Sequence, residues 1–155
     1  MHANAGLFGG DAARVVVGGI SAGAKLAASL TLLQHLGIEK DLAALPRIKG
    51  QILMIPSLLQ KECHAAMLDK LSDPSVSSFV DCKDAPVLPV ERIRFFNELL
   101  GAPAGEGMAG DRRLNPGNAG PEEVKGLPPS VFGVAGRDPL RDEGLLYAKV
   151  LSENG

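Results

Sequence analysis

The sequence predicts an α/β protein built on parallel strands, and three observations support this class. Short apolar runs that contain Val or Ile recur at residues 14–18, 48–58 and 130–136, as expected of strands buried in a parallel sheet. A helical stretch of small residues, 24–36, lies between the first two runs and completes a β-α-β unit. A Gly-rich turn joins the first run to this helix, where open α/β sheets place their sites.

The length and composition fit one globular domain. The chain has 155 residues, which is long enough for a packed core. Its 45% hydrophobic and 22% charged residues are ordinary for a globular protein. We expect the core to comprise 1–59 and 129–155, with an excursion and a loop-rich connection at 60–128. The net charge of −2 gives no basic surface for nucleic acid. No apolar run reaches the roughly 18 residues of a membrane span, and the absence of a targeting signal makes the cytoplasm the default location.

The first of the later elements is an amphipathic helix. After Pro89, apolar residues recur at helical spacing until a stop signal at Gly101. We expect its two aromatic residues, Phe95 and Phe96, to pack in the core, as large apolar side chains usually do. The alternative is that they form the wall of a substrate pocket.

The remaining segments are less regular. Residues 63–71 allow a single helical turn. Seven glycines and five prolines in 101–130 predict a long surface connection without regular elements. The chain closes with a predicted helix over 142–154, for which Asn154-Gly155 is a C-terminal signal.

The Gly-rich turn has the sequence form of a nucleophile elbow, Gly19-Ile20-Ser21-Ala22-Gly23. A serine on a sharp strand-to-helix turn projects its hydroxyl beyond the sheet, and glycines two positions to either side remove bulk. The helix that follows directs free N–H groups at this serine, so the Ala22 amide can stabilise an oxyanion. Ser21 is the candidate nucleophile and Ala22 the candidate oxyanion donor.

Other interpretations of this turn carry less weight. Gly-x-Ser-x-Gly also occurs by chance in glycine-rich chains, where it serves only packing. A phosphate-binding loop is excluded by spacing, because Ala24 separates Gly23 from Lys25 and Leu26 stands where a magnesium-binding hydroxyl is needed. No dinucleotide-binding Gly-x-Gly-x-x-Gly pattern is present either. The two cysteines lack disulfide or Cys-x-x-Cys spacing and are expected to be free thiols.

Several segments together resemble the α/β-hydrolase fold-3 esterases, the hormone-sensitive-lipase-like group. The resemblance covers essentially the whole chain and implies a partial, three-layer α/β-hydrolase fold with parallel strands and a nucleophile elbow. Ile20 and Lys25 depart from the aspartate and asparagine common at these positions. The matching segments are 9–15 before the elbow, the elbow at 18–24, the loop segment 111–116, and the acid-bearing signature at 127–129 and 136–144.

The resemblance implies hydrolysis of small-molecule carboxylic esters through an acyl-serine, without a metal or an organic cofactor. It also implies Ser21 as nucleophile and Asp138 as the acid that orients a histidine. Asp138 follows the third strand and therefore lies at the same sheet edge as Ser21. It could instead be only a turn former before Pro139. We expect Asp142 and Glu143, at the start of the last helix, to serve capping and the helix dipole.

The expected base is missing, because all three histidines precede Asp138. His2 belongs to the amino-terminal approach, on the far side of the sheet from the site. His35 is expected to cap the end of the elbow helix. His64 lies on the correct edge and is either an exposed loop residue or a surrogate base.

In the family, a His-Gly-Gly-Gly-type oxyanion loop precedes the region that matches this chain, and the histidine follows it. We therefore expect a partial hydrolase with little activity of its own and with an open strand edge that favours self-association. Two alternatives stay open. One is a non-catalytic small-molecule binder, similar to the plant gibberellin receptors; the other is an inert product of a truncated gene.

Overall fold

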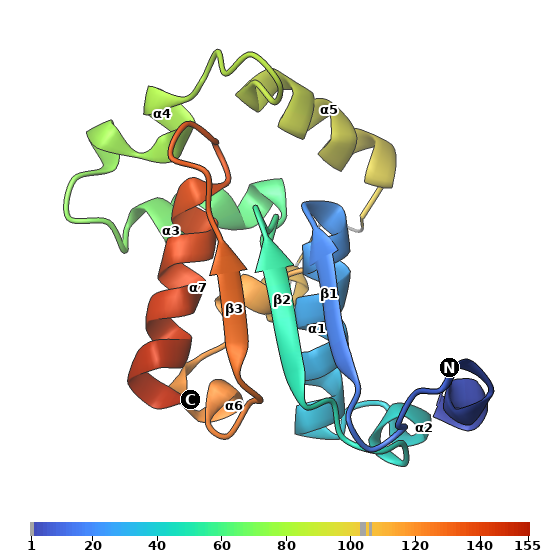
Figure 1. Cartoon of the computed structure of the whole chain (residues 1–155). Helices are drawn as coiled ribbons and strands as arrows, with labels where there is room; N and C mark the ends of the chain where they lie inside the picture. Colours follow the sequence, from blue (N-terminus) through green and yellow to red (C-terminus); the bar gives the residue numbers. More distant parts are fainter. Residues whose placement is uncertain (1, 103–104, 106) are drawn as a thin grey trace.

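Three parallel strands form the centre of the structure, a computed structural model that describes residues 2–102, 105 and 107–155 (Figure 1). They are β1 (Val16–Ile20), β2 (Gly50–Met54) and β3 (Ser130–Gly133), in the order β1-β2-β3. The register pairs Gly18 with Ile52 and Ile52 with Val131. The predicted α/β class with a parallel sheet is confirmed.

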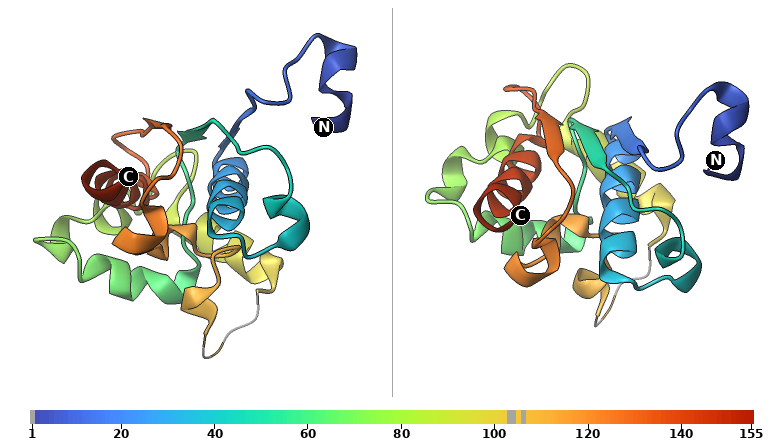
Figure 2. Two further views of the ribbon diagram at one scale, coloured as in Figure 1. Left: turned by 90° about the horizontal axis from the view of Figure 1, so that it is seen from below. Right: turned by 60° about the horizontal axis from the view of Figure 1, so that its bottom comes forward.

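Two long helices pack on one face of this sheet, α1 (Ala22–Leu36) behind β1 and β2, and α7 (Arg141–Asn154) behind β3 (Figures 1 and 2). Alternate strand residues point toward them, so Leu53 is fully buried. Phe132 on β3 meets Tyr147 on α7 edge to face, with ring centroids 6.2 Å apart. The side chains that fill this layer include Ala28, Leu32, Leu53, Leu58, Val124, Tyr147 and Leu151.

The opposite face of the sheet carries apolar side chains that remain exposed. Val16, Ile20, Ile52, Met54 and Val131 are between 40% and 66% exposed, and within the described residues no helix covers them (Figure 2). Of the three layers expected, the described residues thus provide the sheet and one helical layer.

The shorter elements lie around this core. Helix α5, predicted from its spacing, crosses above the carboxyl ends of the strands (Figure 1), and the helical turn expected at 63–71 is present as α3. The short helices are α2 (Lys40–Ala43), α3 (His64–Leu68), α4 (Ser78–Asp81), α5 (Val90–Leu100) and α6 (Pro121–Val124), with 3-10 turns η1 (His2–Phe8), η2 (Lys61–Cys63), η3 (Pro74–Val76), η4 (Met108–Gly110) and η5 (Pro116–Asn118).

The expectation of a surface connection without regular elements at 101–130 is wrong for the described residues. This segment contains α6, η4 and η5, and Val124 is fully buried in the core. Asn115 is fully buried too, where its Oδ1 accepts from Gln60 N at 2.6 Å and its Nδ2 donates to Met108 O at 2.9 Å. Its side chain satisfies backbone groups that no regular element pairs, which is why glycine and proline content misled the prediction.

Two further expectations fail. Phe95 and Phe96 are each 53% exposed rather than packed in the core, because α5 lies across the strand ends instead of against the sheet. His35 does not cap α1; Gly37 does, in the left-handed conformation, and its N–H donates to Gln34 O at 3.2 Å.

The two acids at the start of α7 hold neighbouring loops instead of capping their own helix. Glu143, whose side chain is 0% exposed, accepts from Leu58 N at 2.6 Å and Leu59 N at 3.0 Å through Oε2. Asp142 Oδ2 accepts from Ser78 N at 2.6 Å. The expectation that these residues cap their own helix is therefore wrong. Glu143 fixes the segment that follows β2, directly beside the end of β1.

Replacing Glu143 with Ala should strongly destabilise the chain. The variant leaves two buried N–H groups without an acceptor, and each such group costs roughly 1–3 kcal/mol. We expect the free energy of unfolding, measured by urea titration, to fall by about 3 kcal/mol or more. Glu153→Ala, on the exposed side of the same helix, removes only a surface pair with Lys149 and should cost at most about 0.5 kcal/mol. Equal losses in the two variants would contradict the role given to Glu143.

Candidate active site at the carboxyl end of the sheet

Ser21 occupies a strained turn between β1 and α1. Its φ is 55° and its ψ is −115°, and its N–H donates to Met54 O at 2.9 Å while its carbonyl accepts from Lys25 N at 3.1 Å. Among the described residues, Ile55 at the end of β2 is the other non-glycine residue with positive φ, at 40°. Strain of this kind costs roughly 1–3 kcal/mol per residue and gathers at functional sites. Here both strained residues lie at one edge of the sheet.

Close packing of backbone against backbone explains the first glycine of the motif. A Cβ built on Gly19 would overlap the carbonyl group of Gly23 in the first turn of α1. A Cβ on Gly23 would meet nothing within 4 Å. The expectation that both glycines remove bulk therefore holds for Gly19 but not for Gly23.

The N-terminus of α1 begins directly after Ser21. Ala22 is its first residue, so the Ala22 N–H has no carbonyl within the helix to bind. This free donor and the positive end of the helix dipole lie beside the Ser21 side chain.

A mainly apolar hollow of about 500 Å³ opens at Ser21. Ser21 and Ala22 form one part of its wall and α5 another. Its apolar lining consists of Leu26, Leu88, Ile93, Phe96, Leu100 and Leu140. The exposure of Phe96 thus has a structural reason, since its ring faces this hollow. Volume and lining fit a site for a small apolar molecule.

Lys25 is the charged residue of the lining. Its Nζ donates to Leu59 O at 3.4 Å. Burial lowers the pKa of Lys25, while the nearby Glu143 carboxylate opposes this effect. Lys25 thus holds the carbonyl of the segment after β2 whose amides Glu143 holds.

Asp138 lies in the loop between β3 and α7, at the same end of the sheet as Ser21 (Figure 1). It is 8% exposed, and its Oδ1 accepts from Leu140 N at 2.9 Å. Burial raises the pKa of Asp138, and the Leu140 hydrogen bond opposes the shift. Its Oδ2 has no hydrogen-bond donor within the part of the chain that the structure describes. Asp138 thus stabilises a turn before Pro139 and still has one oxygen available.

His64 is not the exposed loop residue that the sequence predicts. Its side chain is 14% exposed, its Nε2 lies 3.2 Å from Glu143 Oε1, and its ring centroid lies 4.4 Å from that of Phe79. The polar contact does not have hydrogen-bond geometry. His64 packs against Glu143 and Phe79 and does not line the Ser21 hollow.

The other two histidines do not contribute to this site either. His35 lies in the last turn of α1, at the opposite edge of the sheet. The side chain of His2, expected on the far side of the sheet, lies outside the described residues. The described residues thus bring Ser21, Ala22 and Asp138 to one edge and place no histidine in the hollow.

Two negative findings concern the described residues only. No group of three or more His, Cys, Asp or Glu side chains among them is placed to hold a metal ion. None of their helices has both the length and the apolar character needed to cross a bilayer.

Comparison with known proteins gives consistent matches over the whole chain. It is 32% identical to the carboxylesterase NlhH of Mycobacterium tuberculosis over 98% of its own length and 42% of that protein's. It is 33% identical to the esterase LipI of the same organism, over 95% and 39%. The chain thus spans less than half the length of these curated relatives.

Solved structures of similar proteins also match nearly the whole chain. Vibralactone cyclase superposes with a TM-score of 0.76 at 31% identity, covering 99% of this chain and 41% of that one. The carboxylesterase EstE1, cloned from a metagenomic library, gives a TM-score of 0.68 at 29% identity over 99% and 46%. A family described as having the alpha/beta hydrolase fold matches residues 1–155. The chain belongs to this alpha/beta hydrolase family.

Proposed function

We propose that this chain carries the nucleophile of a serine carboxylic-ester hydrolase. The observation that carries the proposal is Ser21, held with a strained backbone between a strand end and a helix N-terminus and open to a hollow of about 500 Å³. Relatives named carboxylesterase and esterase support it. The chain spans 42% of the length of the first of these relatives, so the esterase activity of a full-length protein remains a proposal.

The chemistry follows from the positions of these groups. Ser21 Oγ forms a bond to the ester carbonyl carbon as its proton passes to a base, and the carbonyl oxygen becomes an oxyanion that the Ala22 N–H stabilises. Collapse of this intermediate breaks the bond to the alkoxy oxygen, which leaves as the alcohol with the transferred proton. Water then attacks the carbonyl carbon of the acyl-serine in the same way, which releases the carboxylic acid and restores the Ser21 hydroxyl. No organic cofactor or metal is invoked.

Asp138 has the properties of the orienting acid. Its Oδ2 is available to accept the N–H of an imidazole, and an imidazolium beside it would offset the burial that raises the pKa of Asp138. We infer that the base is not one of the histidines seen here, since the described side chains of His35 and His64 lie away from the hollow.

The hollow suggests the substrate class. Leucine, isoleucine and phenylalanine side chains make up most of its wall, so we expect esters with an apolar acyl or alcohol group rather than highly charged esters.

A specific observation also favours a second candidate, a non-catalytic binder of small molecules. The hollow has the volume for a ligand, yet no described histidine lines it. Saturable binding of an apolar ligand by a chain that shows no Ser21-dependent hydrolysis would favour this candidate over the esterase.

The main prediction concerns turnover by residues 1–155. Without a base, hydrolysis of p-nitrophenyl butyrate should be several powers of ten below ordinary esterase rates. Added imidazole supplies a base from solution, so the rate difference between the native chain and Ser21→Ala should grow with imidazole concentration. Ser57→Ala, which removes another hydroxyl from the same hollow, should keep this difference.

Three outcomes separate the possibilities. Ordinary esterase rates that are lost in Ser21→Ala would contradict the predicted inactivity. Loss of those rates in His64→Ala as well would identify His64 as the base. Identical imidazole dependence in the native chain and Ser21→Ala would contradict the role of Ser21.

We also propose that the chain self-associates. Strand β1 is at the edge of the sheet, and the apolar side chains on the open face include Val16 and Val131. Such surfaces pair with other chains. Light scattering at micromolar concentrations should report dimers or larger species, and Val16→Lys combined with Val131→Lys should shift the chain toward monomer. A monodisperse monomer of the native chain would contradict this proposal.

A further inference from the structure

A second hollow lies at the opposite edge of the sheet from Ser21 and has a different chemical character. It encloses about 320 Å³ between the end of α1, the segment that leads into β2 and the segment 126–129 that leads into β3. Both strands begin at this edge. Because the hollow is separated from the Ser21 site by the length of the strands, nothing in the proposed ester hydrolysis uses it.

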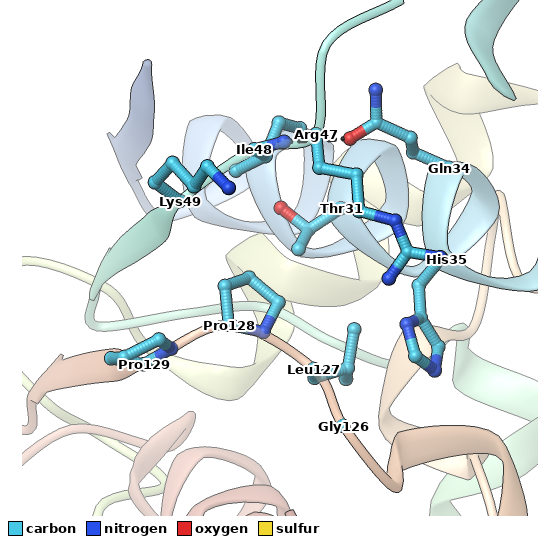
Figure 3. A pocket seen from close by; sticks show the side chains of 10 residues that line it. All are labelled: Thr31, Gln34, His35, Arg47, Ile48, Lys49, Gly126, Leu127, Pro128 and Pro129. Carbon is cyan, nitrogen blue, oxygen red and sulfur yellow. Dashed lines mark hydrogen bonds between the residues drawn. The ribbon is translucent and has the colours of Figure 1, made fainter. Parts of the chain in front are cut away.

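Basic side chains from two segments, the end of α1 and the residues before β2, line this hollow. Figure 3 shows the guanidinium group of Arg47 beside the ring of His35 at one end and the side chain of Lys49 toward the other. None of the residues that line the hollow is acidic. The described residues provide no ion-pair partner for Arg47, Lys49 or His35, although the chain as a whole has a net charge of −2.

The backbone of the segment that carries Arg47 and Lys49 is fixed in place by hydrogen bonds. Gln34 is 8% exposed, and its Oε1 accepts from Ile48 N at 2.8 Å, between the two basic residues. Its Nε2 donates to the carbonyl oxygens of Leu42 and Pro46, each at 3.2 Å. The backbone at Lys49 is held as well, since Lys49 N donates to Val15 O at 2.8 Å.

The facing wall is also rigid. It is formed by Gly126 to Pro129 (Figure 3). The two prolines fix their own φ angles, and Pro129 O accepts from Gln51 N at 3.0 Å at the start of β2. The backbone of both walls is thus positioned before any ligand arrives, whereas the exposed side chains of Arg47 and Lys49 become ordered on binding.

We propose that this hollow is a binding site for a small phosphorylated molecule. A guanidinium presents a planar fork of donors that matches two oxygens of a phosphoryl group, and an ammonium adds a compact positive charge. An imidazole N–H adds a further donor. The volume exceeds that of a lone ion and lies at the lower end of the range for small-molecule sites. The apolar wall of Leu127, Pro128 and Pro129 would contact the uncharged part of the ligand.

Isothermal titration of the chain with pyrophosphate, at constant ionic strength, tests this proposal. Constant ionic strength is needed because salt alone screens a basic surface. We expect one equivalent to bind. Arg47→Met should raise the dissociation constant on the order of tenfold or more, and Lys49→Met should raise it to a smaller extent. Lys70→Met removes one exposed positive charge elsewhere and should leave the constant unchanged.

Three results would overturn the proposal. They are the absence of binding at millimolar pyrophosphate, an equal loss of affinity in Lys70→Met and Arg47→Met, and citrate binding as tightly as pyrophosphate. The last result would indicate a general anion hollow without preference for phosphoryl groups. Ser21→Ala should bind pyrophosphate like the native chain, so this experiment does not depend on the esterase proposal.

Discussion

The close approach of two backbone segments, the end of β1 and the first turn of α1, is the constraint on which the candidate site depends. No side chain fits at Gly19, because its Cβ position is occupied by the carbonyl group of Gly23. The chain must therefore turn within one residue, and Ser21 adopts a φ of 55° to do so. The same turn places a helix N-terminus beside the hydroxyl. The strained backbone of Ser21 and the position of the Ala22 N–H beside its side chain thus have one physical origin.

The turn is supported by a network of buried polar groups behind it. Glu143 holds the amides of Leu58 and Leu59, and Lys25 holds the carbonyl of Leu59. This segment reaches the turn itself, since Ser57 N donates to Ser21 O at 3.5 Å. A buried carboxylate is costly unless it is hydrogen-bonded. Here that requirement ties α7, α1 and the end of β2 together around the candidate nucleophile.

The sequence predicts the elements whose signals are local. Helical spacing identifies α5, and the glycine pattern identifies the elbow at Ser21, because both depend on residues close together in the chain. The roles of Glu143 and His64 were not predictable in this way. Glu143 binds backbone groups 84 and 85 positions away. His64 is buried against Glu143 and Phe79, neighbours that the local sequence does not specify. The buried loop around Asn115 was not predictable for a related reason, since a side chain replaces the regular backbone pairing there. The exposure of Phe96 depends on where α5 lies in space, which periodicity cannot specify.

A matched pair of glycine variants tests the central claim most directly. The measurement is the rate at which a fluorophosphonate labels Ser21 in the presence of added imidazole, which supplies the base that the described residues lack, with folding checked by circular dichroism. Because only Gly19 is required by contact, Gly19→Ala should distort the turn and greatly reduce labelling, whereas Gly23→Ala should label like the native chain. Labelling of a folded Gly19→Ala variant at the native rate would contradict the account, because the reactivity of Ser21 would then not depend on this turn.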